Sequence, residues 1–385
     1  MKGVLIISNY FPPEMGAASN RIFQMAKGLS EYNEVTVICP YPNYPTGKIF
    51  KNYKSKKEER IDNMTVKRLW IYPSNSANKL IRLFSMLSFS LSVFWFILWN
   101  KIPKTVVINS PPLLVAFTSL FILSNKKHKL ILNVSDLWPR AGFELGAIKE
   151  GIGYKLLLSL ERYNYKKASV ILGQSEEILS HVRSITTDKE FLLYRNFPDF
   201  EPPKLHPKST STNSKIKLVY AGLLGVAQGV FRLCEELDFS NIEFHIYGSG
   251  SDEKKLKQYL KDNPNLPITM YGSIKREKLH QELLQYDVAI IPLLNRIYGS
   301  VPSKIFEFAR LGLPILYFGG GEGETIIQTF ELGLVAEAGN YHNLNGVINS
   351  MDVSNFSEES KLKIQKTAIE SFDASLQLKK LQSII

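Results

Sequence analysis

Short apolar runs alternate with helical patterns along the chain. In the first half, the runs are Val4–Ser8, Val35–Cys39, Thr105–Asn109, Leu130–Val134 and Val170–Gly173. Segments with apolar residues spaced near 3.6, such as Ala17–Leu29 and Tyr154–Lys167, lie between them. Because strands that alternate with helices are typical of parallel βαβ units, this half predicts an open α/β sheet.

The alternation stops at residues 196–215 and then restarts. This stretch is rich in Pro, Ser and Thr and has no period, so it is the predicted linker. The strand-like runs that follow are Ile216–Ala221, Ile242–Tyr247, Ile268–Tyr271, Val288–Pro292 and Pro314–Phe318. The last segment, Glu358–Ile385, has the pattern of one or two helices. A chain of 385 residues suits two such domains in tandem.

Composition indicates a globular protein of a reducing compartment. The chain is 44% hydrophobic and 22% charged, which argues against wholesale disorder. Its two cysteines, Cys39 and Cys234, are far apart and lack metal-ligand spacing, so we expect structural thiols. Met1 and Lys2 lead directly into the first strand-like run, so no secretory signal is expected here.

The net charge of +11 is concentrated in the first half. Residues 1–200 hold 27 Lys and Arg against 15 Asp and Glu, and the remainder holds 20 against 21. A basic half indicates an anionic partner. The basic residues lie between apolar strands without a recognisable nucleic-acid module, so no nucleic acid is expected. An anionic membrane surface is favoured, because the same half contains the longest apolar run.

That run is Leu83–Asn100, which carries no charge between Arg82 and Lys101. At 18 residues it is near the lower limit for a bilayer span. Ser85, Ser88 and Ser92 would share one helical face, and aromatic residues flank that stripe, which favours shallow insertion at a membrane interface. A buried core helix and a true span are the alternatives. The candidate acceptor and membrane residues are Arg21, Arg82, Phe89, Trp95, Phe96 and Trp99.

Two loops of the first half could carry chemistry. Gly16 lies in a strand–loop–helix turn where backbone N–H groups can approach an anion, although a purely structural turn is equally compatible. Asp136 follows an apolar strand directly, so it is expected at the carboxyl end of the sheet. There it would be a catalytic carboxylate or an acceptor for a sugar hydroxyl, and a helix cap is the alternative.

The segment Val301–Pro314 is the most informative part of the second half. Pro302 stands where a helix would start and Gly312 where it would end. Ser303 and Lys304, with the first-turn N–H groups, could bind a diphosphate, and Glu307 could accept from both hydroxyls of a ribose. A glycine-rich loop, residues 319–324, follows the next strand, with a helix expected near Thr325.

Five segments together resemble the GT4-type glycosyltransferases. They are Tyr10–Arg21, Tyr41–Lys48, Ser110–Pro112, Asp136–Pro139 and Val301–Pro314. The five segments span nearly the whole chain and follow one another in the same order as the motifs of that family. The resemblance is closest to the branch that contains the L-fucosamine transferases of O-antigen and capsule assembly.

The resemblance implies a GT-B fold, in which two Rossmann-like domains face each other. Residues 1–200 would bind the acceptor and associate with the membrane, and residues 201–365 would bind the nucleotide sugar. Residues 366–385 would form a helix that returns to the first domain. Carried over by motif, the catalytic residues are Asp136 and Lys304. The expected donor site comprises Gly16, Gly225, Gln228, Arg276, Ser303, Lys304, Glu307, Gly321 and Glu322.

This chain departs from the family pattern at three places. Many relatives carry a Glu eight residues before the equivalent of Glu307, where this chain has Gly299. The wider family places Arg and Lys in the donor loop, where Leu223 and Gln228 stand here, and often a His before the Asp, where Ser135 stands. These differences leave open which group steadies the transferred sugar.

The activity implied by the resemblance is retaining sugar transfer without a metal or other cofactor. The leaving diphosphate would accept the proton of the incoming hydroxyl, and Lys304, helix N-termini and Arg276 would stabilise the developing charge. The donor is expected to be a UDP-sugar rather than a GDP-sugar. The acceptor would be a polyprenyl-diphosphate-linked sugar at the cytoplasmic face of the inner membrane. A GT-B sugar-nucleotide epimerase and an inert membrane-associated homologue are the alternatives.

Overall fold

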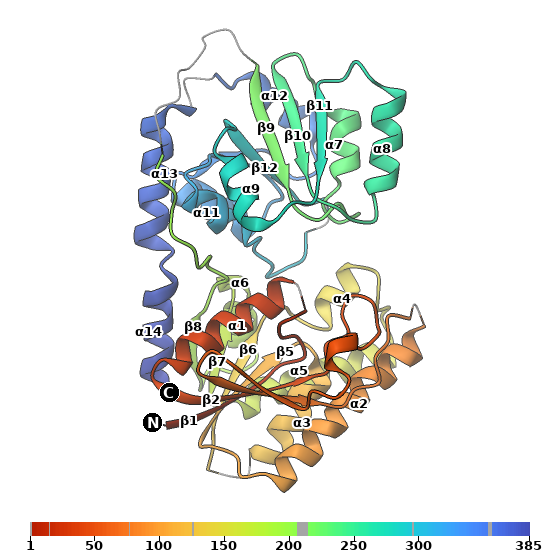
Figure 1. The fold of residues 1–385 in the computed structure, drawn as a ribbon, viewed down its shortest axis with the longest axis vertical. Coiled ribbons are helices and arrows are strands. Elements are labelled where there is room, and N and C mark those ends of the chain that lie inside the picture. The colour runs from red at the N-terminus through yellow and green to blue at the C-terminus, as the bar shows by residue number, and fades with distance from the viewer. Residues whose placement is uncertain are drawn as a thin grey trace. The chain divides into compact units, whose positions relative to one another are not determined.

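The computed structural model describes residues 2–14, 16–76, 78–124, 127–205, 215–294, 296–352 and 356–385. Residues 206–214 of the predicted linker lie outside this part of the chain. The chain divides into two compact units (Figure 1). The N-terminal unit comprises residues 1–196, 297–300 and 375–385, and the C-terminal unit comprises residues 197–296 and 301–374.

The N-terminal unit is built on an eight-stranded sheet in the order β3-β4-β2-β1-β5-β6-β7-β8. Every pairing is parallel except β3 with β4, and Val4 of β1 lies opposite Val35 of β2. The strands are β1 (Lys2–Ile7), β2 (Asn33–Pro40), β3 (Glu58–Ile61), β4 (Met64–Leu69), β5 (Thr105–Ser110), β6 (Lys129–Val134), β7 (Val170–Gly173) and β8 (Glu190–Leu193). Consecutive apolar side chains on the central strands are buried because helices cover both faces of the sheet.

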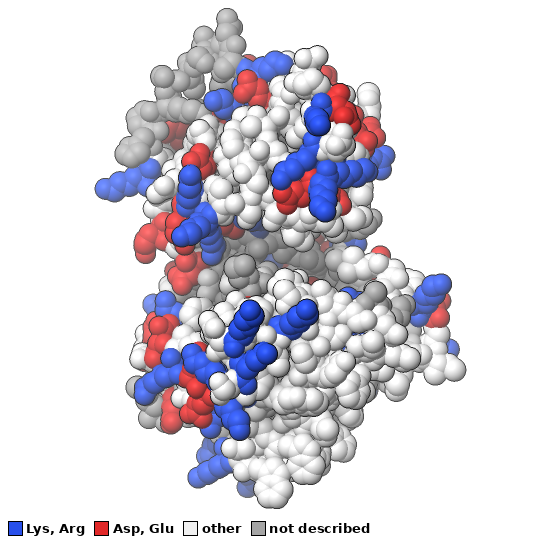
Figure 2. Space-filling view, turned by 45° about the vertical axis from the view of Figure 1, so that its right-hand side comes forward, with Lys and Arg blue, Asp and Glu red and all other residues white. Residues whose placement is uncertain are grey.

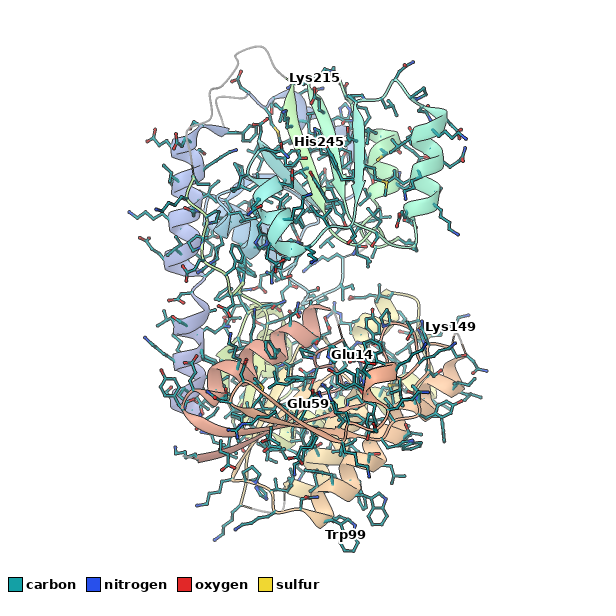
Figure 3. All side chains as sticks on the ribbon, in the orientation of Figure 1. Glu14, Glu59, Trp99, Lys149, Lys215 and His245 are labelled. Carbon is teal, nitrogen blue, oxygen red and sulfur yellow. The ribbon has the colours of Figure 1, made fainter. Side chains whose placement is uncertain are left out.

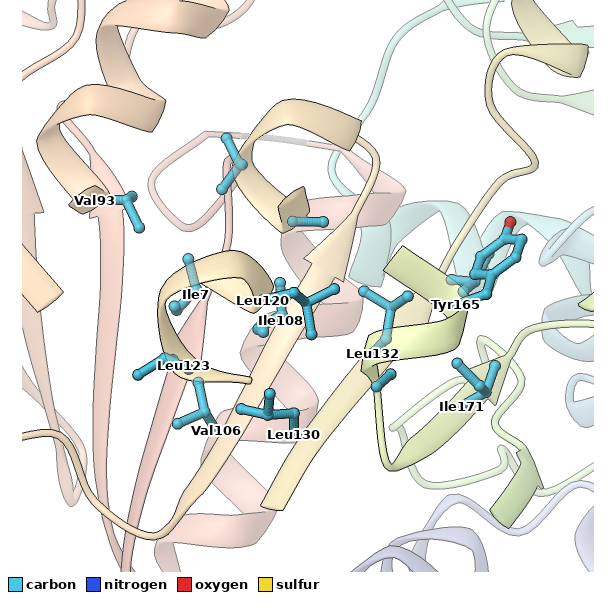
Figure 4. Packing of buried hydrophobic residues seen from close by; sticks show 14 of the residues in the cluster. Ile7, Val93, Val106, Ile108, Leu120, Leu123, Leu130, Leu132, Tyr165 and Ile171 are labelled. Atoms are coloured by element: carbon cyan, nitrogen blue, oxygen red, sulfur yellow. The ribbon is translucent and has the colours of Figure 1, made fainter. Parts of the chain in front are cut away.

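Two helical layers enclose this sheet. One face is covered by α2 (Lys79–Trp99), α3 (Leu113–Leu123), α5 (Ile152–Lys167) and α6 (Glu176–Arg183). Figure 4 shows Val93 of α2 and Leu120 of α3 within that core. The other face is covered by α1 (Ala17–Ser30) and α14 (Ala374–Ile384). A short helix, α4 (Arg140–Glu144), follows β6, and a 3₁₀ turn, η1, spans Lys51–Tyr53.

The C-terminal unit contains a six-stranded parallel sheet in the order β11-β10-β9-β12-β13-β14. The strands are β9 (Ile216–Ala221), β10 (Ile242–Tyr247), β11 (Ile268–Gly272), β12 (Val288–Pro292), β13 (Ile315–Phe318) and β14 (Gly333–Val335). On one face lie α7 (Val230–Glu236), α8 (Glu253–Asp262) and α12 (Tyr341–Asn349). On the other lie α9 (Arg276–Leu283), α10 (Lys304–Arg310), α11 (Glu322–Thr329) and α13 (Glu358–Ser371).

The end of the chain forms two helices, one of the two arrangements that the pattern of Glu358–Ile385 predicted. The break falls between α13 and α14, and α14 belongs to the N-terminal unit. There Gly28 of α1 allows close approach, because a side chain at that position would collide with Leu378. Asn33 donates to Gln382, and the Arg195 N–H donates to Gln377. These contacts fasten α14 to the N-terminal unit.

The apolar run expected at Leu83–Asn100 is helix α2. By length and composition, residues Leu80–Trp99 could cross a membrane. The helix nevertheless packs against α3, and Phe89 is fully buried. The choice of Phe89 as a membrane residue was therefore wrong, because this side chain belongs to the core.

The serine stripe of α2 also faces the protein. Ser88 is buried, and its hydroxyl accepts from the Tyr72 N–H. Ser92 donates to the Trp70 carbonyl at 2.8 Å. Ser88 and Ser92 therefore satisfy backbone groups of the segment that leaves β4.

Candidate active site

The order of the C-terminal sheet predicts a ligand site at its carboxyl edge. Strand order reverses between β9 and β12, and such switch points open a crevice outside the strand ends. The loops that follow these two strands meet there, where the Leu294 N–H donates to the Ala227 carbonyl at 3.0 Å. The expected donor residues Gly225 and Gln228 lie in the first loop, and Ser303 and Lys304 follow the second.

Glu307 is the centre of a charged cluster on α10. Its side chain is only 9% exposed. Lys304 Nζ lies 3.0 Å from Oε2, while Arg276 Nε and His280 Nε2 lie 3.4 Å and 2.8 Å from Oε1. Three of the residues chosen from the sequence, Arg276, Lys304 and Glu307, are thus brought together, and α9 supplies a fourth partner.

The surroundings of Glu307 hold it ionised. Burial on its own raises the pKa of this carboxyl. The hydrogen bond from His280 and the positive charges of Lys304 and Arg276 outweigh burial and lower the pKa to about 2. Glu307 is therefore an anion throughout the physiological pH range, as an acceptor for two ribose hydroxyls would need to be.

His280 is a site residue that the sequence interpretation missed. Its ring packs on Phe200, with ring centroids 4.3 Å apart, and its Nε2 points to Glu307. Phe200 is fixed in turn by Arg310, whose Nε donates to the Phe200 carbonyl at 2.7 Å. The available signal was the spacing of Arg276 and His280, because residues four apart share one helix face.

The remaining residues expected at the donor site lie in loops that depend on glycine. Gly225 passes beneath Gln228, so that an added Cβ would be 2.8 Å from Gln228 Oε1. This oxygen is buried and has no hydrogen-bond partner among the described residues. Gly321 precedes α11 with φ of 71°, and a side chain there would meet the Arg296 guanidinium. Glu322 is the first residue of α11.

In the N-terminal unit, the loop between β1 and α1 is fastened to the segment after β2. Glu14 is 3% exposed, and its Oε1 accepts from the backbone N–H groups of Asn43 and Tyr44 at 2.7 and 2.8 Å (Figure 3). Arg68 donates to the Pro12 carbonyl from the other side. Two motifs that resemble the family, Tyr10–Arg21 and Tyr41–Lys48, are therefore held together by Glu14. Gly16 ends the loop directly before α1, whose N-terminus has no side-chain cap.

Arg21 lies beneath the β6–α4 turn rather than on the surface. It is 4% exposed and donates to Asn133 Oδ1 at 2.9 Å and to the Tyr194 carbonyl at 2.6 Å. Asn133 donates in turn to Asn109 Oδ1. The expected position of Arg21 on the membrane surface was wrong, because its guanidinium is buried and joins the ends of β6 and β8.

Asp136 follows β6 at the carboxyl edge of the N-terminal sheet. The residue preceding α4 is Pro139, so Asp136 is not the N-cap of that helix. Burial raises the pKa of Asp136 to about 6, against the opposing charge of Arg21. Carboxyl groups with a raised pKa are common at functional sites, and the catalytic role of Asp136 stays a prediction.

The raised pKa predicts how activity and stability depend on pH. If Asp136 acts as a carboxylate, kcat/KM falls as the pH drops through about 6. The folded state binds a proton at Asp136 more tightly than the unfolded state does. The contribution of the Asp136 carboxyl to the free energy of unfolding is therefore lost as the pH rises from about 4 to about 6. Asp136→Asn should lose transfer activity, yet melt at a higher temperature than the wild type at pH 8.

The comparison is made by thermal unfolding at pH 5 and pH 8, with a pH–rate profile on the same samples. The gain in melting temperature of Asp136→Asn should shrink at pH 5, where the wild-type carboxyl is largely protonated. An equal gain at both pH values would contradict a raised pKa for Asp136. So would a wild-type pH–rate profile in which kcat/KM does not fall until well below pH 6.

Gly299, where many relatives carry Glu, lies in the four-residue segment that joins the N-terminal unit. Its N–H donates to Glu177 at 2.8 Å and its carbonyl accepts from Ser175 at 2.7 Å. The neighbouring Tyr298 N–H donates to Glu144, and the Tyr298 ring lies under the Arg140 guanidinium. These hydrogen bonds hold residues 297–300 within the N-terminal unit, which the sequence pattern did not indicate.

The geometry predicts that a side chain at position 299 is not tolerated. Gly299 has φ of 83°, and an added Cβ would lie 2.8 Å from Ile178. Gly146 has a similar φ of 69° but open space around it. Gly299→Ala should therefore cost about 1–3 kcal/mol more than Gly146→Ala in chemical unfolding, because only the former also overpacks. Equal costs would contradict this account. Gly299→Glu should lower transfer rather than restore a missing function.

Comparison with known protein families finds a match in the C-terminal unit. Residues 216–351 match the family of glycosyl transferases group 1. The matched segment includes the donor loop, the Glu307 cluster and the glycine-rich loop. No curated protein sequence matches the chain.

Solved structures match the whole chain at low sequence identity. Sucrose-phosphate synthase from Thermosynechococcus elongatus aligns with TM-score 0.77 and 12% identity, covering 100% of this chain and 98% of that one. The lipopolysaccharide outer core galactosyltransferase WaaB aligns with TM-score 0.67 and 16% identity, covering 99% and 98%. Anabaena Alr3699/HepE, in complex with UDP-glucose, aligns with TM-score 0.68 and 12% identity, covering 100% of both chains. These likenesses confirm the predicted GT-B fold.

Proposed function

We propose that the chain is a retaining glycosyltransferase that moves a sugar from a nucleotide diphosphate to a lipid-linked sugar. The observation that carries the proposal is the Glu307 cluster, which lies within the segment that matches glycosyl transferases group 1. A buried carboxylate held ionised beside Lys304 and Arg276 suits a ribose next to a diphosphate.

The donor in this proposal is a UDP-sugar. Glu307 accepts from the ribose hydroxyls, and Lys304 and Arg276 lie within reach of the negative charge that develops on the leaving diphosphate. That diphosphate accepts the proton of the attacking hydroxyl, so the step needs neither a protein nucleophile nor a metal. The solved HepE complex with UDP-glucose supports this choice of base. An N-acetylated deoxyhexosamine such as L-FucNAc is the sugar suggested by the L-fucosamine transferase resemblance.

The acceptor in this proposal is an undecaprenyl-diphosphate sugar of O-antigen or capsule assembly. Support comes from the excess of Lys and Arg in residues 1–200, which would meet a diphosphate at a membrane surface. The likeness to a lipopolysaccharide galactosyltransferase agrees with this acceptor class. The chain would then work as a peripheral protein at the cytoplasmic face of the inner membrane.

The test offers purified protein a short-chain prenyl-diphosphate GlcNAc and a panel of UDP- and GDP-sugars, with EDTA present. Mass spectrometry should detect one mass gain that depends on both substrates. Lys304→Ala and Glu307→Ala should lose it, whereas Lys257→Ala and Glu253→Ala, from an exposed pair on α8, should keep it. An isomerised nucleotide sugar formed without acceptor would indicate an epimerase instead. Nucleotide binding with no reaction would indicate an inert homologue.

A further inference from the structure

Helix α2 has two apolar faces. Phe89, Val93 and Ile97, spaced four residues apart, are at most 1% exposed and lie in the core of the N-terminal unit. A helix with one face in a protein core cannot be surrounded by lipid, so α2 does not span a bilayer alone. Its other face is apolar as well, which a surface helix of a soluble domain does not need.

The second face forms a continuous exposed stripe. Its residues follow helical spacing and are each about half exposed: Phe84, Leu87, Leu91, Trp95 and Leu98. In all, ten large apolar side chains among the described residues of α2 are more than one-third exposed. An apolar surface of this extent is typical of a binding face rather than of scattered surface residues.

Aromatic side chains extend the stripe at both ends. Trp99 is 79% exposed, stacks with Trp95 at 6.4 Å, and projects away from the unit (Figure 3). Tyr72 packs edge-on against Phe84 at 5.2 Å. On the neighbouring helix α3, Phe121 is 58% exposed. In Figure 2 a broad white area covers the lower part of the N-terminal unit. Exposed Trp and Tyr with apolar neighbours suit the boundary between water and acyl chains.

Charge selects an anionic partner. Helices α2, α3 and α5 contain one acidic residue, Glu161, which is buried and bonded to Tyr165 and His181. The charged side chains described as exposed on these helices are all basic: Arg82, Lys155, Arg162, Lys166 and Lys167.

Further lysines follow the C-terminal ends of α2 and α3. Lys101 and Lys104 follow α2, and Lys127 follows α3, all exposed. The two loops adjoin, because His128 bonds the Pro103 carbonyl at 2.9 Å and the Lys129 N–H donates to the Lys104 carbonyl at 2.7 Å. An apolar stripe bordered by lysines complements lipid acyl chains beneath anionic headgroups.

We propose that the outer face of α2, with Tyr72, Phe121 and the lysines after α2 and α3, is the surface by which this protein lies on an anionic bilayer. The helix lies in the plane of the interface, with the outer stripe in the acyl boundary and the inner stripe in the protein core. This inference deepens the proposed function, from which it takes the lipid-linked acceptor, by naming the membrane surface and its lipid class. Its test requires neither donor nor acceptor.

The test is sedimentation of the full chain with vesicles of phosphatidylcholine alone or with phosphatidylglycerol. Wild-type protein should bind the anionic vesicles, with a blue shift of tryptophan fluorescence. Trp95→Ser/Trp99→Ser should weaken binding by about tenfold or more. Lys101→Glu/Lys104→Glu should weaken it by about 25-fold or more. Leu362→Ser/Ile369→Ser, which replaces two exposed apolar residues of α13, is the matched control and should bind as the wild type does.

Three results would overturn the inference: no binding of the wild type to anionic vesicles, unchanged binding by both pairs of variants, or a soluble dimer that Trp95→Ser/Trp99→Ser dissociates. The last would mean that a second copy covers the stripe. Thermal unfolding of each variant checks that the fold is kept. Calorimetric binding of UDP reports on the proposed donor site separately, so failure of one proposal is distinguishable from failure of the other.

Discussion

Glu307→Gln should lower kcat/KM for the nucleotide sugar by about 100-fold. Gln keeps the size of the side chain but removes the charge, and each hydrogen bond to a buried charged group is worth about 1.5–3 kcal/mol. The loss should appear chiefly in KM if the ribose is bound equally in the ground and transition states. The measurement is initial-rate kinetics over a range of donor concentrations.

The control for Glu307→Gln is Glu253→Gln, because Glu253 also pairs with a lysine but lies on the exposed surface of α8. It should change kcat/KM less than twofold. A Glu307→Gln enzyme with unaltered kinetics would remove Glu307 from the donor site.

His280→Asn provides a second check. If His280 only positions Glu307, this variant should raise KM for the donor while leaving the rate at saturation nearly unchanged.

Arg68→Met should destabilise the N-terminal unit by about 3–5 kcal/mol, which lowers its melting temperature by roughly 10 °C. Arg68 is 1% exposed at its side chain, and its Nη2 lies 2.7 Å from Glu59, whose side chain is 6% exposed. Removal of the guanidinium leaves a buried carboxylate facing Lys56 alone and leaves the Pro12 carbonyl without its donor. Differential scanning calorimetry and urea unfolding measure the effect.

The double variant Arg68→Met/Glu59→Met tests the cause. Because it removes both charges, it should recover much of the lost stability. Arg183→Met breaks an exposed pair with Glu176 in the same unit and should cost less than about 1 kcal/mol. A double variant no more stable than Arg68→Met would show that the bond to Pro12, rather than the stranded charge, dominates.

Local pattern was sufficient for most of the two sheets but failed at their edges. The strands near the middle, such as β6 and β12, are continuous apolar runs because both of their faces are covered. At the edges, β4 was missed because it alternates and places the charged Arg68 on its buried side. β8 and β14 are short and only partly buried, so neither composition nor length distinguishes them from loops.

The Glu307 cluster was predictable where its residues share one helix and unpredictable where they do not. Lys304 and Glu307 are three apart on α10, so their proximity follows from helical geometry. His280 comes from α9, and its contact with Glu307 depends on how two helices pack on one sheet. Arg21 looked like a surface cation for the same reason, since its partners Asn133 and Tyr194 lie more than 100 residues away.

The sequence by itself determined the parallel α/β character, the two-domain plan and the helix between Pro302 and Gly312, because these depend on short-range periodicity and on the backbone limits of Pro and Gly. The tertiary structure decided which face of α2 is buried, why position 299 admits only Gly, and how Glu14 and Arg68 fasten the first loop. A side chain is buried or exposed according to which distant segment packs against it. The local spacing of apolar and polar residues does not show which distant segment that is.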